Sequence, residues 1–380
     1  MSTKKKKVFV GLSGGVDSAV SAALLQKEGY DVTGVFIRIA LPGYPCSAGA
    51  DKIEAMRVAA HLDIPFLELD LSKEYAEEVF TTSIQAFARG RTPNPDALCN
   101  RQIKFGAFFD FARARGADYI ATGHYAQLRE SKISETQKFP AKNFLSPAPS
   151  RLRTFPQPSF TSLLAGADAE KDQSYFLWMV PEAVLRHTLF PVGGMQKARV
   201  RELAKKFGLP NSARKDSQGL CFLGDISIEQ MLNKELSPQL GDVLAENGKV
   251  VGTHEGAVLY TLGQRHGFTI FSQDTHTVPH FVIGKDIEKN TITTSTQRYP
   301  TGATTTQVAL REHNWIGPVS SGPCSARFRY RQKLIPAVVE VEKNIATLLE
   351  PHYVPLGQSL VVYKGEVCLG GGIVEDTELC

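Results

Sequence analysis

The sequence predicts an α/β protein: a doubly wound parallel sheet comes first, a small central domain follows, and a β-barrel ends the chain. Three observations support this fold class. An apolar run at residues 8–10 leads through a glycine turn into a helix-forming segment, and strands then alternate with helices as far as residue 125. From about residue 236 onward, short β-rich runs lie between glycines. Strands that alternate with helices at this spacing favour a parallel sheet with its ligand at the carboxyl ends of the strands.

The first half of the chain alternates regularly. Beyond the first strand and helix, strands are expected at residues 31–39, 65–69 and 118–122, and helices at 51–61, 73–89, 100–115 and 197–207. A glycine and a proline close the last of these helices. Residues 131–160 hold five prolines and no sustained periodicity. We therefore expect them to form a long surface loop.

The second half is predicted to consist mainly of strands. They are expected at residues 250–252, 258–262, 281–283 and 292–294 in the central domain, and at 307–310, 326–330, 337–341 and 359–363 in the barrel. The predicted domains are residues 1–228 with the insertion 131–160, residues 229–298, and residues 299–380.

Composition narrows the class of protein. With 380 residues, 42% of them hydrophobic and 22% charged, the chain is typical of a soluble protein of two or three domains. No apolar run approaches the roughly 20 residues of a membrane helix, and no leader sequence precedes the first strand, so we expect no membrane association and a cytoplasmic location. The six cysteines include no Cys-x-x-Cys pair, which argues against a zinc site, an iron–sulfur cluster or a disulfide framework.

The positive charge is concentrated in the middle of the chain. The formal net charge is +4, and residues 126–225 hold 15 Lys and Arg against 9 Asp and Glu. This surplus is consistent with a polyanionic partner and equally with a solvated basic surface.

The turn after the first strand has the features of a phosphate site. A strand, a glycine turn and a helix start direct backbone N–H groups at an anion. Gly14 and Gly15 allow close approach of phosphate, and Asp17 is a candidate Mg²⁺ ligand. The Walker A lysine and the dinucleotide fingerprint are absent. A hydrolase nucleophile elbow also matches, but it leaves Asp17 and Ser18 without a role; a purely structural turn is the remaining alternative.

Two cysteines differ from the others in context. A free cysteine is usually an inert, buried side chain, and we expect this of Cys46, Cys324, Cys368 and Cys380. Cys99 is expected just before a helix, whose N-terminus stabilises a thiolate, and Cys221 lies close to Lys215 and Arg214. Asp96 is a candidate proton shuttle beside Cys99. The residues alone leave open whether this pair of thiols is functional.

Six blocks resemble the tRNA-specific 2-thiouridylase family, which belongs to the PP-loop ATP pyrophosphatases. They are residues 13–18 (SGGVDS), 92–100 (TPNPDALCN), 122–125 (TGHY), 171–175 (KDQSY), 215–221 (KDSQGLC) and 261–265 (TLGQR). The blocks occur in the family's order and span nearly the whole chain. Two departures stand out, because residues 39–46 lack the family's acidic character and the segment 131–160 is long.

The resemblance implies an ATP-dependent sulfurtransferase. The C2 oxygen of a tRNA wobble uridine is adenylated with release of pyrophosphate, and a persulfide sulfur then replaces it to give 2-thiouridine and AMP. Cys221 is implied to carry the persulfide, Cys99 to be the second thiol that forms a disulfide with it, and Asp96 to be the acid/base. Asn94 and Pro95 are implied to lie beside the target base. The resemblance also implies ATP with Mg²⁺ and neither a prosthetic group nor a structural zinc. The implied ATP site comprises Gly11, Leu12, Ser13, Gly14, Gly15, Val16, Asp17, Ser18, Ile37 and Gly123.

The implied partners are tRNA and a protein that donates sulfur. The implied tRNA contacts are His124, Lys171, Asp172, Gln173, Arg329, Tyr330 and Gln358. Near two of them, Arg327, Arg329, Arg331 and Lys333 recur with a period of two, which predicts four cations on one face of a strand. The alternatives are another PP-loop enzyme that adenylates tRNA, such as a lysidine synthase, and a tRNA-binding module with a vestigial nucleotide site. Neither requires two cysteines.

Overall fold

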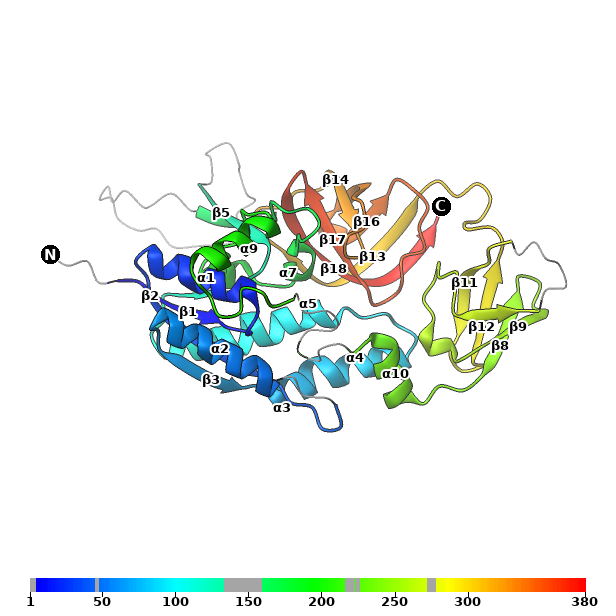
Figure 1. Cartoon of the computed structure of the whole chain (residues 1–380). Helices are drawn as coiled ribbons and strands as arrows, with labels where there is room; N and C mark the ends of the chain where they lie inside the picture. Colours follow the sequence, from blue (N-terminus) through cyan, green and yellow to red (C-terminus); the bar gives the residue numbers. More distant parts are fainter. Residues whose placement is uncertain (1–4, 45–47, 133–158, 216–221, 223–225, 272–277) are drawn as a thin grey trace.

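The computed structural model describes residues 5–44, 48–132, 159–215, 222, 226–271 and 278–380. Its strands form three sheets of five, five and eight strands (Figure 1). The first is a parallel sheet with helices on both faces, the second belongs to the central part of the chain, and the third contains a closed barrel. The α/β fold class with a C-terminal barrel is therefore confirmed.

The parallel sheet has the strand order β3-β2-β1-β4-β7. Its strands are β1 (Lys7–Gly11), β2 (Asp31–Arg38), β3 (Phe66–Asp70), β4 (Tyr119–Ala121) and the short β7 (Thr188–Leu189). Side chains alternate between the two faces of a strand. Val8 and Val10 accordingly pack in one hydrophobic core with helices α1 (Val16–Lys27) and α9 (Lys197–Lys206), and Phe9 packs in the other. Helix α2 (Ala48–Leu62) lies on the same face as α1.

Two long helical segments cover the opposite face. The first runs through α3 (Ser72–Tyr75), a π-helical turn at Ala76–Thr81 and α4 (Thr82–Ala88). The second runs through α5 (Pro95–Cys99), a π-helical stretch at Asn100–Ala107 and α6 (Phe108–Ala114). The prediction that this second helix begins at residue 100 is wrong. Asn94 caps the helix by accepting a bond from the Ala97 N–H at 3.1 Å, and Pro95 occupies its first position.

The central part begins with helix α10 (Ile228–Leu236), which Ser227 and Gln230 cap reciprocally. Its sheet has the order β10-β9-β8-β12-β11. The strands are β8 (Gly241–Ala245), β9 (Val250–His254), β10 (Phe268–Ile270), β11 (Phe281–Asp286) and β12 (Thr291–Ser295). The prediction of a strand at 258–262 is wrong. Gly256 has φ 137°, and a 3₁₀ helix follows it at Ala257–Leu259.

The barrel closes because β13 pairs with both β16 and β18. Its strands are β13 (Thr306–Trp315), β14 (Gly322–Arg327), β15 (Ile335–Glu340), β16 (Ile345–Leu348), β17 (Ser359–Lys364) and β18 (Val367–Leu379). The prediction of four cations on one strand face is wrong, because β14 ends at Arg327. The Gln332 side chain then accepts bonds from the N–H groups of Phe328 and Arg329 at 3.0 and 3.1 Å, and these bonds hold the following residues in a turn.

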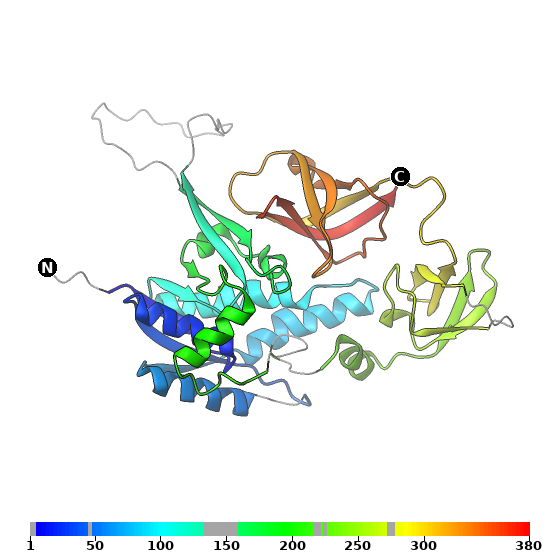
Figure 2. The ribbon, with the colours of Figure 1, turned by 45° about the horizontal axis from the view of Figure 1, so that its top comes forward.

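A hairpin from the first half of the chain extends the barrel sheet. It consists of β5 (Ala126–Lys132) and β6 (Ser159–Ala165), and β6 pairs with β18 through Leu164 and Val367. The expected loop at 131–160 is therefore strand at both ends, and residues 133–158 lie outside the described part. Figure 2 shows this hairpin rising beside the barrel, with the central sheet at the far end of the molecule. Short helices α7 (Ser174–Leu177) and α8 (Glu182–Leu185) follow the hairpin.

In the described part of the chain, no helix has the length and apolar character needed to cross a bilayer.

Candidate nucleotide and sulfur-transfer site

The glycine turn lies where the strand order of the parallel sheet reverses. Strands β2 and β3 follow on one side of β1 and β4 lies on the other, so the loops after β1 and β4 border the crevice in which such sheets bind ligands. Gly123, after β4, packs directly on the start of α1: a Cβ there would lie 2.7 Å from the Ser18 nitrogen. Ile37 lies near the carboxyl end of β2 and is 8% exposed. The structure thus brings the predicted ATP residues to one edge of the sheet.

The glycine turn leaves several backbone donors available. Gly14 has φ 78°, and the Ser18 hydroxyl donates to the Gly15 carbonyl at 3.0 Å. No side chain caps α1, and its first intrahelical bond runs from the Ala19 N–H to the Gly15 carbonyl. The N–H groups of residues 16–18 therefore have no acceptor within the helix. Together with the helix dipole they form a site suited to phosphate.

Asp17, at the start of α1, is held by two side chains from other segments. Its Oδ1 accepts bonds from the Tyr125 hydroxyl and from Lys197 Nζ, both at 2.7 Å, and its Oδ2 lies 2.8 Å from the same Nζ. The Lys197 and Asp17 side chains are 15% and 29% exposed. A single carboxylate beside a phosphate site suits Mg²⁺, which proteins commonly bind through one or two carboxylates together with substrate phosphates. No cluster of three or more His, Cys, Asp or Glu residues in the described ranges is placed to hold a metal ion.

Lys197 was not among the site residues predicted from the sequence. A signal was present, because Lys197 is the first residue of α9 and the first turn of that helix has no acidic residue. A cation at a helix N-terminus opposes the helix dipole. Its position therefore calls for an anionic partner elsewhere, and the structure supplies Asp17.

The segment before the block 215–221 is attached to the glycine turn. The Gly14 carbonyl accepts bonds from Asn211 Nδ2 at 2.8 Å and from Arg214 Nη1 at 3.2 Å. Arg214 also pairs with Asp51 of α2. Arg214 is thus bonded to the glycine turn, and Cys221 itself lies outside the described residues.

Cys99 was predicted to precede a helix, but it does not. It lies inside a helix that starts at Pro95, and its side chain is fully buried in a hydrophobic core. Stabilisation of a Cys99 thiolate by a helix N-terminus is therefore a wrong prediction. Asp96, half-buried, occupies that first turn instead.

Of the four cysteines expected to be inert, Cys324 and Cys368 have thiols that burial keeps protonated. Burial raises the pKa of Cys368 to about 12 and that of Cys324 to about 11. Cys380 is exposed, contrary to expectation, and Cys46 lies outside the described part.

The loop that carries Asn94 and Pro95 touches the barrel. The Thr92 N–H donates to the Leu356 carbonyl at 2.7 Å. The Tyr175 hydroxyl donates to Gln358 Oε1 and to the Ser359 carbonyl, each at 3.2 Å. The predicted target-base loop and the predicted tRNA contact Gln358 therefore lie close together, where the parallel-sheet part of the chain meets the barrel.

The block 171–175 is bonded both to the segment after β4 of the parallel sheet and to the barrel. Gln173 exchanges two bonds with the backbone of Tyr125, the residue whose hydroxyl binds Asp17. Asp172 is 5% exposed and accepts bonds from the Gly166 N–H, the Ser174 N–H and hydroxyl, and Arg327 Nη2, the last at 2.6 Å. These bonds use both oxygens of the Asp172 carboxylate. In this structure the side chain therefore stabilises the contact between the segment 166–174 and the barrel.

The other predicted tRNA residues lie in different environments. His124 is 8% exposed, its Nδ1 lies 2.7 Å from the Thr122 hydroxyl, and burial lowers its pKa well below 6.5. Lys171 is half-buried and Arg329 is exposed. The Tyr330 ring packs on Phe176 with a centroid distance of 4.7 Å.

The chain matches three family models in succession. A "tRNA methyl transferase HUP domain" matches residues 6–225, a "tRNA methyl transferase PRC-barrel domain" matches 229–296, and an "Aminomethyltransferase beta-barrel domain" matches 305–374.

Among solved structures, a 4-thiouridine synthetase bound to RNA and ATP is 18% identical, with a TM-score of 0.33 over 58% of this chain and 46% of that one. An NMN synthetase from Francisella tularensis is 16% identical, with a TM-score of 0.32 over 62% of this chain and 78% of that one. Similarities at this level are too low to support a conclusion about function.

Curated relatives match over nearly the full length. The tRNA-specific 2-thiouridylase MnmA of Nitrosomonas eutropha is 39% identical over 98% of this chain and 99% of its own. The protein of the same name from Francisella tularensis subsp. tularensis is also 39% identical, with the same coverage. The chain therefore belongs to the tRNA-specific 2-thiouridylase family.

Proposed function

We propose that the chain is a tRNA 2-thiouridylase, an ATP-dependent sulfurtransferase that converts the wobble uridine of tRNA to 2-thiouridine. The full-length similarity to proteins of that name supports this activity. The single structural observation that carries the proposal is the phosphate site at residues 11–18, with Asp17 held between Tyr125 and Lys197. A lysidine synthase-like reaction is not favoured, because it gives no role to the two cysteine blocks.

We propose that the phosphates of ATP bind at the N-terminus of α1 and that its adenosine lies beside Ile37 and Gly123. Asp17 would hold Mg²⁺, which would neutralise charge on the phosphates. Lys197, whose ammonium group lies 2.7 Å from the Asp17 carboxylate, would supply a further positive charge beside the phosphates. The uridine C2 oxygen attacks the α-phosphorus and pyrophosphate leaves, which converts a very poor leaving group into AMP.

The sulfur step uses the two thiols. Cys221 accepts a persulfide from a donor protein, and Cys99 then attacks the sulfur bonded to the Cys221 Cβ. This forms a Cys99–Cys221 disulfide and releases hydrosulfide, which displaces AMP from C2, with Asp96 as acid/base; a thiol reductant restores the two cysteines. Because Cys99 is fully buried, and a disulfide requires Cα atoms within about 7 Å, this step requires movement around α5.

The remaining assignments follow the family resemblance. We infer that Asn94 and Pro95 lie beside the target base, and that Lys171, Gln173, Arg329, Tyr330 and Gln358 contact tRNA. We also infer tRNA contacts for His124 and Asp172, whose side chains are buried in this structure. The three domains are proposed at 1–228, 229–298 and 299–380, and the location as the cytoplasm.

Mass spectrometry of tRNA nucleosides after incubation with ATP, Mg²⁺ and sulfide tests the proposal, together with chromatography of the nucleotide products. We expect 2-thiouridine, AMP and pyrophosphate; ADP in place of AMP would contradict a pyrophosphatase mechanism. With a persulfide-donor protein, Cys221→Ser should form no product, and Cys99→Ser should accept a persulfide but not turn over. Cys380→Ser, which alters an exposed thiol, is the matched control and should match the parent.

A further inference from the structure

The glycine turn after β1 contains a peptide unit that has no side chain on either side of it. The unit joins Gly14, with φ 78°, to Gly15, with φ −78° and ψ 161°. Because glycine adopts positive and negative φ about equally readily, such a unit can turn over at little steric cost. In a trans peptide the N–H and the C=O point in opposite directions. The orientation of this unit therefore decides whether a donor or an acceptor faces a ligand at the turn.

In this structure the N–H end of the unit faces two serine hydroxyls. The Gly15 N–H donates to Ser13 Oγ at 3.4 Å, and the hydroxyl oxygens of Ser13 and Ser18 lie 3.3 Å apart. A bond of 3.4 Å is long for an N–H donor, so this N–H is available to a stronger acceptor. One N–H and two hydroxyls thus lie together on the same side of the unit, as donors for phosphate oxygens.

The carbonyl end of the unit is held on the opposite side by two donors. Asn211 Nδ2 and Arg214 Nη1 donate to the Gly14 carbonyl at 2.8 and 3.2 Å. If the unit turned over, both bonds would be lost and the carbonyl oxygen would face the anion, which it repels. The two side chains therefore favour the orientation that suits a phosphate.

Asn211 makes its bond from an unfavourable environment. Its side chain is 3% exposed, and among the described residues its Oδ1 has no hydrogen-bond partner. A buried polar atom without a partner lowers the free energy of unfolding. A leucine has the same branched shape and carries no such atom. The bond from Nδ2 to the Gly14 carbonyl is accordingly what accounts for an asparagine at this position.

The turn that carries Asn211 is itself fixed by α9. The Arg214 N–H donates to the Asn211 carbonyl at 2.9 Å, and Arg201 of α9 donates to the Arg214 carbonyl. The first residue of α9 pairs with Asp17. Helix α9 and the turn that follows it thus hold the start of α1 at two points, the Asp17 carboxylate and the Gly14 carbonyl.

We propose that Asn211 is a positioning residue of the ATP site, which fixes the Gly14–Gly15 peptide with its N–H towards the phosphates. Asn211 touches no phosphate itself, because its amide lies against the carbonyl side of the peptide. This inference rests on the proposed function, since it assumes that the phosphates of ATP bind at this turn. Asn211 then governs the affinity for phosphate groups and has no effect on the affinity for adenosine.

Calorimetric titration with ATP, inorganic pyrophosphate and adenosine, each in the presence of Mg²⁺, tests this assignment. Asn211→Leu should bind ATP and pyrophosphate about 10-fold more weakly, because the peptide loses a hydrogen bond that selects its orientation. Its affinity for adenosine should equal the parent's. Its urea midpoint should not fall, because leucine also removes the unpartnered Oδ1. A merely structural role predicts the opposite: a lower urea midpoint and no difference between ligands with and without phosphate.

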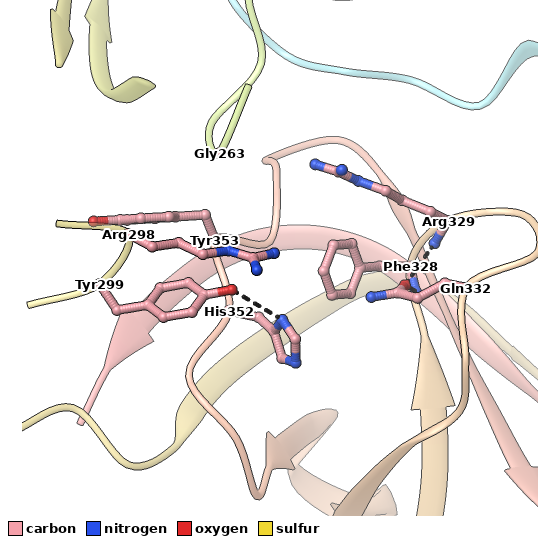
Figure 3. Close-up of a pocket in the computed structure, with 8 residues that line it drawn as sticks. All are labelled: Gly263, Arg298, Tyr299, Phe328, Arg329, Gln332, His352 and Tyr353. Carbon is pink, nitrogen blue, oxygen red and sulfur yellow. Dashed lines mark hydrogen bonds between the residues drawn. The ribbon is translucent and has the colours of Figure 1, made fainter. Parts of the chain in front are cut away.

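Asn314→Asp is the matched control. The Asn314 amide also donates to backbone carbonyls, those of Trp178 and Val180 at 2.6 and 3.1 Å, but it belongs to the barrel. This variant should leave all three affinities unchanged even where it lowers the urea midpoint. A second control lies in the cavity of Figure 3, where Tyr299→Phe removes the hydroxyl contact with His352 Nδ1 at 3.4 Å; it should match the parent for all three ligands.

Asn211→Asp is a second variant, with the same shape but an acceptor in place of the donor. It should show the same pattern of losses, and it decides the matter if Asn211→Leu does not fold. Unchanged affinity for ATP and pyrophosphate would overturn the inference, and so would a loss for adenosine as large as the loss for ATP. If the parent binds ATP and pyrophosphate and the variants bind them equally well, only this inference fails; if the parent binds neither, the proposed function fails with it.

Discussion

Replacing Asp172 by asparagine should destabilise the junction between the parallel-sheet domain and the barrel. The Asp172 and Arg327 side chains are only 7% and 9% exposed, and the Asp172 Oδ2 accepts bonds from Arg327 and from the Ser174 hydroxyl. An asparagine keeps one carbonyl oxygen for the two backbone N–H groups but puts an N–H₂ group where Arg327 needs an acceptor. The guanidinium is then left buried without its counter-charge.

The expected loss is large. Removing one partner of a buried ion pair costs about 3–5 kcal/mol of unfolding free energy. The matched control is Glu202→Gln, which removes the exposed pair with Arg199, whose side chains are 65% and 57% exposed. That change should alter stability by no more than about 0.5 kcal/mol.

Urea unfolding followed by circular dichroism measures both changes. A double variant with Asp172→Asn and Arg327→Met should lose less than the sum of the two single losses, because the two side chains depend on each other. If Asp172→Asn unfolds at the parent's urea concentration but binds tRNA more weakly, the reasoning is refuted and Asp172 is a direct tRNA ligand. Equal unfolding together with equal tRNA affinity would also refute it.

Three further outcomes are expected. Lys197→Met should lose most of the release of pyrophosphate from ATP, whereas Lys197→Arg should keep part of it, because the cation beside Asp17 is retained. Tyr125→Phe removes one bond to that carboxylate and should slow pyrophosphate release by about 10-fold, with Tyr119→Phe as the control that should leave it unchanged. Because burial lowers the pKa of His124 in the folded state, the unfolded state takes up a proton below about pH 6.5 that the folded state does not, so the urea midpoint should fall as pH drops from about 8 to about 5.5. His124→Gln should reduce that fall, and a urea midpoint that does not change with pH in the parent would contradict the reasoning.

The sequence predicted helices and strands well where a single local signal, such as hydrophobic periodicity or a glycine turn, determines the backbone conformation. The glycine turn, the alternation of strands with helices and four of the six barrel strands follow from periodicity and breakers, whereas β16 and β18 were not predicted. The start of the helix at Pro95 was missed because the Asn94 cap competes with the turn signal of two nearby prolines. The end of β14 at Arg327 depends on Gln332, five residues further on, whose side chain bonds are not visible in a period-two pattern.

The candidate site likewise has residues that local sequence suggests and residues that only the tertiary structure brings together. Residues 11–18 could be proposed as a phosphate site from sequence, because a site of this kind depends on the local backbone. Lys197 could not be linked to Asp17, since 180 positions separate them and only the packing of α9 on α1 brings them together. For Asp172, a polar residue in a family motif suggested contact with an external ligand, whereas its acceptors are used by Gly166, Ser174 and Arg327.

The pairing of β6 with β18 has a consequence for how the protein is made. Leu164 pairs with Val367, so an edge formed early in translation waits until almost the entire chain has left the ribosome before it gains its partner. Contacts this distant in sequence form slowly, and an unpaired strand edge is prone to pair with other chains. The nascent protein therefore has a long interval in which β6 needs protection, and a premature stop codon after the central domain would leave that edge permanently open. Truncated products should accordingly be recovered with chaperones or in aggregates rather than as a working nucleotide domain.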